Sequence, residues 1–171
     1  MKIRFSCSVI LVALIHFLFI SSTANAQENM ETGVACDTHG FVVDNDPAGL
    51  NLRESPKGKI ITQIPINAEL KIVRYDSGWF EVTDVDNLKD LSGWVYAKHI
   101  STGLKNYDPH AVEWLTEKPD ESSKKVIKLN DIPLIAGLLE CQGGWVKIQA
   151  KEAAGWLAPR LQCPLAYTNC S

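Results

Sequence analysis

Residues 77–82 read Ser-Gly-Trp-Phe-Glu-Val, and residues 92–95 read Ser-Gly-Trp-Val. The same pair of motifs returns as Gly-Gly-Trp-Val-Lys-Ile at residues 143–148 and Ala-Gly-Trp-Leu at residues 154–157. In each motif, small turn residues precede a Trp and an aliphatic or aromatic residue, as at the start of a short β-strand. A motif pair that recurs in one chain predicts two copies of one small module.

Short strands separated by turns are predicted in the first half, residues 34–103. Leu50 and Leu52 alternate with polar neighbours, which is the period-2 pattern of a half-buried strand. Further strands are predicted at residues 60–66, 70–75 and 79–83, and a last one begins at residue 93. Short strands at close intervals favour a small barrel or sandwich over alternating strands and helices. The predicted fold class is therefore all-β.

The second half, residues 107–166, repeats this order more loosely. Val112 and Trp114 are matched to Leu50 and Leu52, and the loop between the two Trp motifs is shorter than in the first half. Residues 103–106, Gly-Leu-Lys-Asn, are predicted to be a short linker, and residues 167–171 a tail.

The first half resembles the bacterial SH3 (SH3b) domain. The resemblance rests on Leu-Asn-Leu-Arg-Glu-Ser-Pro at residues 50–56, on the motif at 77–82 and on Gly-Trp-Val-Tyr at 93–96. The second half keeps both Trp motifs but has Glu-Trp-Leu-Thr at residues 113–116 where the first has Asn-Leu-Arg, so it is the more divergent copy. The resemblance implies two small SH3-like β-barrels in tandem. It also implies a targeting module for peptidoglycan or peptides.

The N-terminal residues are predicted to be a secretory signal that is removed. Lys2 and Arg4 precede an apolar run at residues 9–20, and Ala-Asn-Ala at residues 24–26 is a cleavage-site pattern. The run is shorter than the roughly 20 residues that span a bilayer. Cleavage after residue 26 predicts a periplasmic or secreted product with no membrane span; an uncleaved N-terminal anchor is the alternative.

The charge of the predicted mature chain excludes one class of partner. Loss of Lys2 and Arg4 leaves 15 basic residues against 20 acidic ones, a net charge of −5. Nucleic acids require a basic surface, so no nucleic-acid partner is expected.

Four cysteines remain after the predicted cleavage, and an even number in an exported chain favours disulfides. They are Cys36, Cys141, Cys163 and Cys170. Three full pairings are possible, and the sequence leaves them open. In each of them Cys36 is bonded to the second half, because it is the one candidate in the first.

The aromatic residues of the motifs are the candidate ligand-binding residues. The alternation places Phe80 and Val82 inside and Trp79 with Glu81 outside, and likewise Val146 and Ile148 inside with Trp145 and Lys147 outside. An outward Trp can stack on a sugar ring or a proline, although it can also cover a barrel end or lie between modules. Resemblance to SH3 folds places Tyr96 and His99 beside the peptide groove. The predicted ligand-binding set is Trp79, Trp94, Tyr96, His99, Trp145 and Trp156.

No catalytic residue, metal site or cofactor is predicted. Cys36 and His39 lie close enough to be considered as a nucleophile and base or as metal ligands, but a disulfide is the better use for Cys36. Residues 44–49 resemble a calcium loop in their acidity but lack its downstream Glu, so a polar turn is predicted.

These observations predict an exported, non-catalytic binding protein that recognises peptidoglycan or envelope peptides. The alternatives are a periplasmic protein-interaction adaptor or inhibitor, and an accessory subunit of a cell-wall hydrolase.

Overall fold

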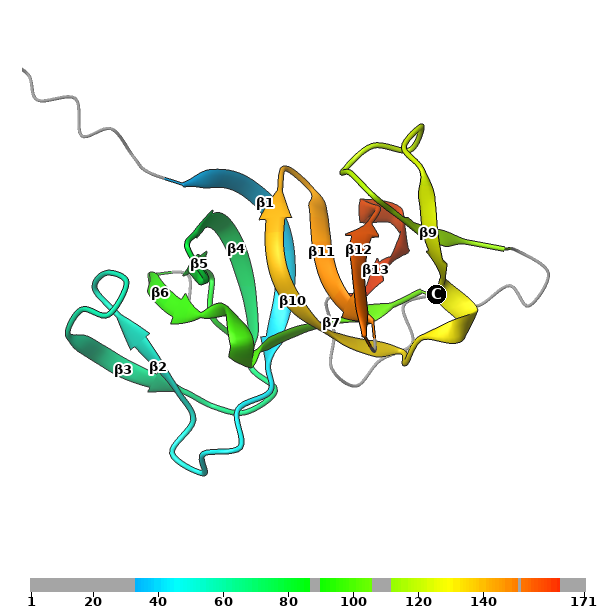
Figure 1. The fold of residues 1–171 in the computed structure, drawn as a ribbon. Coiled ribbons are helices and arrows are strands. Elements are labelled where there is room, and N and C mark those ends of the chain that lie inside the picture. The colour runs from blue at the N-terminus through cyan, green and yellow to red at the C-terminus, as the bar shows by residue number, and fades with distance from the viewer. Residues whose placement is uncertain (1–32, 87–89, 106–111, 151, 164–171) are drawn as a thin grey trace, which may run out of the picture. The chain divides into compact units, whose positions relative to one another are not determined.

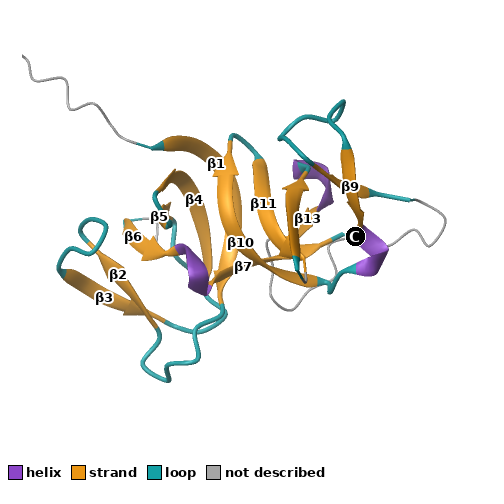
Figure 2. Ribbon diagram, viewed as in Figure 1, coloured by secondary structure: helices purple, strands orange, loops and turns teal. Residues whose placement is uncertain are grey.

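The computed structural model describes residues 33–86, 90–105, 112–150 and 152–163, all of which belong to one compact unit (Figure 1). The predicted signal at residues 1–26 and the tail at 167–171 lie outside these ranges. The described part consists of β-strands joined by turns and three single-turn 3₁₀ helices (Figure 2), which confirms the all-β prediction. None of the helical segments in these ranges has the length and apolar character needed to cross a bilayer.

The first half contains seven strands and one 3₁₀ turn among its described residues. They are β1 (Val34–Val42), β2 (Leu50–Arg53), β3 (Ile60–Ile64), β4 (Glu69–Asp76), β5 (Trp79–Thr83), β6 (Gly93–Tyr96), η1 (Ala97–His99) and β7 (Ile100–Leu104).

The second half supplies the remaining elements. They are β8 (Trp114–Thr116), β9 (Lys125–Lys128), η2 (Leu129–Asp131), β10 (Ile135–Gln142), β11 (Trp145–Ala150), β12 (Ala153–Leu157), η3 (Pro159–Leu161) and β13 (Gln162–Cys163).

The order of strand pairing in the first half recurs in the second. In the first half β3 pairs with β2, β2 with β6, β6 with β5 and β5 with β4. In the second, β9 pairs with β8, β8 with β12, β12 with β11 and β11 with β10. All of these pairs are antiparallel, as expected for strands joined by short turns.

The two halves are joined by β7 into one antiparallel sheet of 13 strands (Figure 1). Ser101 pairs with Phe41 of β1 and also with Gly137 of β10, while Gly103 pairs with Cys163 of β13. A strand has two hydrogen-bonding edges, and those of β7 serve both halves. The prediction of two separate barrels is therefore not confirmed.

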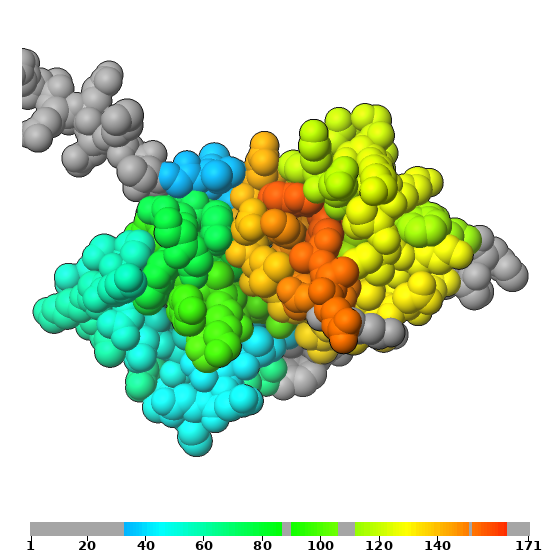
Figure 3. Space-filling model, viewed as in Figure 1, coloured from blue at the N-terminus to red at the C-terminus, as the bar shows by residue number. Residues whose placement is uncertain are grey.

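The predicted linker is wrong where it can be compared with the structure. Gly103 and Leu104 are buried residues of β7, and Lys105 donates its backbone N–H to the Leu161 carbonyl at 2.8 Å. Asn106 lies outside the described residues. In the space-filling view, the orange β10–β12 segment accordingly lies directly beside the green segments of the first half (Figure 3).

One hydrophobic core runs through both halves. It includes Leu52 and Phe80 from the first half and Leu115, Val146 and Leu157 from the second, all of them inaccessible to solvent.

The predicted alternation along the Trp strands is confirmed. Phe80, Val82, Val146 and Ile148 are buried, whereas Trp79, Glu81, Trp145 and Lys147 are half-buried. This alternation leaves the first Trp of each motif at the surface of the sheet.

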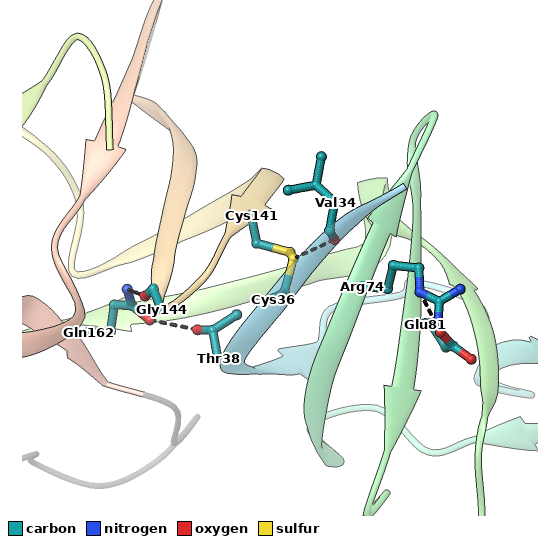
Figure 4. The surroundings of a disulfide bond; sticks show 8 residues. All are labelled: Val34, Cys36, Thr38, Arg74, Glu81, Cys141, Gly144 and Gln162. Carbon is teal, nitrogen blue, oxygen red and sulfur yellow. Dashed lines mark hydrogen bonds and ion pairs between the residues drawn. A yellow bond between two sulfur atoms is a disulfide. The ribbon is translucent and has the colours of Figure 1, made fainter. Parts of the chain in front are cut away.

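A disulfide joins Cys36 on β1 to Cys141 on β10, with the two Cα atoms 5.7 Å apart (Figure 4). The prediction that Cys36 is bonded to the second half is thus confirmed. Cys36 also forms a short parallel bridge with Gly143, in which the Asp37 N–H donates to the Gly143 carbonyl at 2.7 Å and the Gly143 N–H donates to the Ala35 carbonyl at 2.8 Å. Cys163 is also disulfide-bonded, and its partner, like Cys170, lies outside the described residues.

Candidate binding site on the first half

Three aromatic side chains come together at the ends of β5 and β6. The strand register places Trp79 opposite Tyr96, and their ring centroids are 5.3 Å apart with planes tilted by 42°. The 3₁₀ turn η1 follows Tyr96 directly, and side chains three residues apart in such a turn lie on the same side. His99 therefore approaches Tyr96, with ring centroids 5.9 Å apart.

These rings line a pocket of about 170 Å³, which we call the aromatic pocket. Its remaining walls come from β2 and from the loop that precedes it. The lining residues are Asp44, Leu50, Asn51, Arg53, Trp79, Tyr96 and His99. Asn51 and Arg53 reach the pocket because they are the outward residues of β2, whereas Leu50 and Leu52 face the core.

Residues 48–101 match the bacterial SH3 domain. The match covers β2 to the start of β7 and includes every residue of the aromatic pocket except Asp44. No curated protein sequence matches the chain.

The polar groups at the aromatic pocket are held in defined positions. The Asp44 carboxylate accepts a hydrogen bond from the Asp46 backbone N–H at 3.0 Å and lies 3.5 Å from His99 Nδ1. The Arg53 guanidinium donates from Nη1 to the Gly58 carbonyl at 2.7 Å, which fixes its position beside the β2–β3 turn.

One polar atom at the pocket has no hydrogen-bond partner among the described residues. This is Oδ1 of Asn51, which is buried. A buried acceptor without a donor is costly, so a water molecule or a ligand donor that reached Asn51 would remove an existing penalty. Next to it, the Trp79 and Tyr96 rings can stack on a flat apolar group or hold a cation over their faces.

Three of the six predicted ligand-binding residues lie outside this pocket. Trp94 is half-buried on β6 and pairs with Glu81 and Arg53 in the sheet. Trp145 is half-buried and packs against the core, and Trp156 is only 8% exposed. The structure thus brings together Trp79, Tyr96 and His99, while Trp156 has little surface to offer a ligand.

Among the described residues of the second half, the positions that correspond to Tyr96 and His99 hold no aromatic side chain. Val146 pairs with Leu157 as Phe80 pairs with Val95, so Ala158 occupies the position of Tyr96 and Leu161 that of His99. Both Ala158 and Leu161 are buried.

Between these two positions in the sequence, Arg160 of η3 forms ion pairs. Arg160 donates to both carboxylate oxygens of Glu113, at 2.6 and 3.0 Å, and to Glu121 at 3.2 Å. The hydrogen bonds from Arg160 lower the pKa of Glu113, and those same bonds raise the pKa of Arg160. The charged groups of these three residues are therefore paired with one another and not with a ligand.

The pocket residues that sequence reasoning missed are Asp44, Leu50, Asn51 and Arg53. For Asn51 and Arg53 a signal existed, because alternation along residues 50–53 places them on the face opposite the core. Asp44 had none. The predicted polar turn at residues 44–49 is confirmed, since Asp46 accepts the Ala48 and Gly49 N–H groups through its side chain and backbone. The proximity of Asp44 to His99 depends on tertiary packing.

In this structure Cys36 is neither a nucleophile nor a metal ligand, because its sulfur is bonded to Cys141. Within the described ranges, no group of three or more His, Cys, Asp and Glu side chains is arranged to hold a metal ion.

Proposed function

We propose that this chain is an exported, non-catalytic binding protein that recognises cell-envelope material, peptidoglycan or its peptides, through the aromatic pocket. The observation that carries the proposal is the convergence of Trp79, Tyr96 and His99 on one pocket inside the segment that matches the bacterial SH3 domain. Bacterial SH3 domains commonly bind cell-wall material. Exposed aromatic rings suit both the apolar faces of sugars and flat peptide groups.

Export to the periplasm or beyond is part of the proposal. The Cys36–Cys141 disulfide supports it, because structural disulfides persist in oxidising compartments outside the cytoplasm. The predicted signal at residues 1–26 supports it independently.

The second half is proposed to be a divergent SH3-like copy, so that the chain is a tandem pair fused through β7. The recurrence of the strand-pairing order supports this. Because its counterpart of the aromatic pocket holds Ala158 and Leu161, we assign Trp145 and Trp156 to the stability of this half.

A protein-interaction adaptor is the second candidate, and one observation favours it. Strand β3 lies at one end of the sheet and pairs only with β2 in the described part of the chain. Its residues Ile60 and Ile61 are 45% and 46% exposed. An open strand edge with exposed apolar side chains can accept a strand from another protein.

Pelleting with purified sacculi tests the proposal. The wild-type chain should sediment with sacculi, and Trp79→Ala should weaken the affinity, measured from the pelleted fraction at increasing amounts of sacculi, about tenfold, the equivalent of about 1.4 kcal/mol. Trp145→Ala is the matched control, because it removes the corresponding side chain of the second half, and it should bind like the wild type. A melting temperature of Trp79→Ala no lower than that of Trp145→Ala would exclude loss of folding as the cause.

Three results would count against the proposed function. An adaptor would remain in the supernatant and recover one protein in a pull-down. A hydrolase would release soluble muropeptides from the sacculi. Equal loss of binding in Trp79→Ala and Trp145→Ala would show that the aromatic pocket is not the site.

A further inference from the structure

A second pocket adjoins the aromatic pocket, and both halves of the chain form it. Its volume is about 350 Å³. The first half contributes Tyr96, Ala97 and Lys98, and the second half contributes Gly137, Leu139 and Gln149. We call it the inter-half groove.

Tyr96 connects the two pockets. It lines the aromatic pocket and also the inter-half groove, and it is 44% exposed. A ligand seated against Trp79 that continued past Tyr96 would therefore enter the groove. The groove exists because β7 pairs with β10, which places residues 137–139 next to η1.

Gly137 keeps the floor of the groove open. A Cβ atom added there would meet no atom within 4 Å, and Gly137 is not among the residues with positive φ. Neither crowding nor backbone conformation therefore requires glycine, although glycine within a strand weakens it. Such a glycine is typical of a place where a ligand approaches the backbone closely. At Gly40, in contrast, an added Cβ would lie 2.8 Å from Ile100.

The chemistry of the two pockets differs in a way that suits a short peptide. The groove is lined by the apolar residues Ala97 and Leu139 and by Lys98, a cationic residue. The aromatic pocket offers the Asp44 carboxylate beside two aromatic rings. A ligand with a positive end, an apolar middle and a negative end complements this order, because opposite charges attract at both ends. A glycan strand of N-acetylated sugars has no cationic end to place beside the Asp44 carboxylate.

We propose that the inter-half groove is a second subsite, which takes an apolar side chain of a short peptide whose amino end lies in the aromatic pocket and whose carboxylate faces Lys98. This inference rests on the proposed function and narrows its ligand from envelope material in general to its peptides. It also gives the second half a part in recognition through Gly137 and Leu139.

The test uses the full chain and two probes from one source. Sacculi are treated with an amidase, and the freed stem peptides and the glycan strands are purified separately. The affinity of each fraction is measured by calorimetry for the wild type, Trp79→Ala, Gly137→Leu and Lys98→Gln. Gln142→Leu is the matched control, because it adds the same side chain at an exposed position of the same strand outside the groove.

The wild type should bind the stem peptides and not the glycan strands. Gly137→Leu should weaken peptide binding at least tenfold by filling the groove, and Lys98→Gln at least threefold, whereas Gln142→Leu should change nothing. The backbone amide signals of residues 97 and 137 should shift when peptides are added to the wild type. This last measurement needs no variant and stands even if Gly137→Leu fails to fold.

The failures are distinguishable. If neither fraction binds, or if Trp79→Ala binds as the wild type does, the proposed function itself fails. If Trp79→Ala loses binding but Gly137→Leu does not, and residue 137 shows no shift, the aromatic pocket is a site and the groove is not. Binding of the glycan strands instead of the peptides would overturn the peptide assignment.

Discussion

Cys36 and Cys141 are bonded to each other although 105 residues separate them in the sequence. The bond lies at the junction of the two halves, next to the short parallel bridge between Cys36 and Gly143. At the same junction the Thr38 hydroxyl donates a hydrogen bond to Gln162 Oε1 at 2.6 Å (Figure 4). Gln162 Nε2 in turn donates to the Gly144 carbonyl at 2.7 Å. Strand β1 is thus fastened to the second half covalently and by hydrogen bonds, so the halves share their stability.

The first prediction concerns this disulfide. Cys36→Ser with Cys141→Ser should lower the free energy of unfolding by about 2–5 kcal/mol, since the bond closes a long loop and restricts the unfolded chain. Urea denaturation followed by circular dichroism measures the loss, and the serine pair leaves the bond of Cys163 intact. An unchanged urea midpoint would show that the β1–β10 junction is held by its hydrogen bonds alone.

The second prediction is that both halves unfold in one step, because β7 belongs to the sheet of each. The five tryptophans report on the two halves separately, with Trp79 and Trp94 in the first and Trp114, Trp145 and Trp156 in the second. In the chain labelled with fluorotryptophan, all five ¹⁹F signals should disappear at one urea concentration.

A core substitution in β7 sharpens this prediction. Ile100 is fully buried, so Ile100→Ala should lower stability by about 2–5 kcal/mol and move all five signals together. Separate transitions for the two groups of tryptophans would show that the halves are independent domains.

Local patterns in the sequence predicted strands β2 to β6 of the first half but not β1, because alternation of apolar and polar residues is a local property. Phe80 and Val82 are buried as expected, and the disulfide joins the halves as the cysteine positions required. Strand β7 is buried on both sides. It was not predicted, because residues 101–104, Ser-Thr-Gly-Leu, show no alternation of apolar and polar residues. Its burial arises from partners far away in the sequence.

The register of the second half shows the same limit. Matching Trp114 to Leu52 is wrong by one residue, since Thr116 pairs with Trp156 as Arg53 pairs with Trp94. Leu115 is therefore the buried counterpart of Leu52, and Trp114 faces outward beneath Lys128. A shift of the register by one residue exchanges the two faces of a strand. Because Trp114 and Leu115 are both apolar, the sequence does not indicate which of them faces the core.

The third prediction explains the glycine of the repeated Gly-Trp motif. An added Cβ would lie 2.6 Å from the Arg53 carbonyl oxygen at Gly93 and 2.7 Å from the Leu115 Cβ at Gly155. Neighbouring strands therefore approach too closely for a side chain in either copy. Gly93→Ala and Gly155→Ala should each lower stability by about 1–3 kcal/mol, the usual cost of overpacking.

Gly137→Ala is the control for these two variants. It adds the same methyl group within a strand but meets no atom within 4 Å, so it should be neutral or stabilise by about 0.5–1 kcal/mol. Thermal unfolding of the three variants gives the comparison. Equal effects at Gly93, Gly155 and Gly137 would mean that close approach is not the reason for glycine in the motif.

The last prediction concerns pH and the Glu113–Arg160 ion pair. Hydrogen bonds from Arg160 hold the pKa of Glu113 below its ordinary value of 4.5, so the folded state favours the charged carboxylate. The stability that this gives is fully present above the pKa of the unfolded chain and is lost as pH falls through the lower pKa of the folded state. Because the Arg160 side chain is 52% exposed, we expect a contribution of at most about 1 kcal/mol. Glu113→Gln should therefore be less stable than the wild type at pH 7 and equal to it near pH 2. Glu117→Gln, an exposed change on the same hairpin, should follow the wild type throughout. Urea denaturation at several pH values measures all three proteins, and a difference between Glu113→Gln and the wild type that persisted at pH 2 would assign the loss to packing instead of charge.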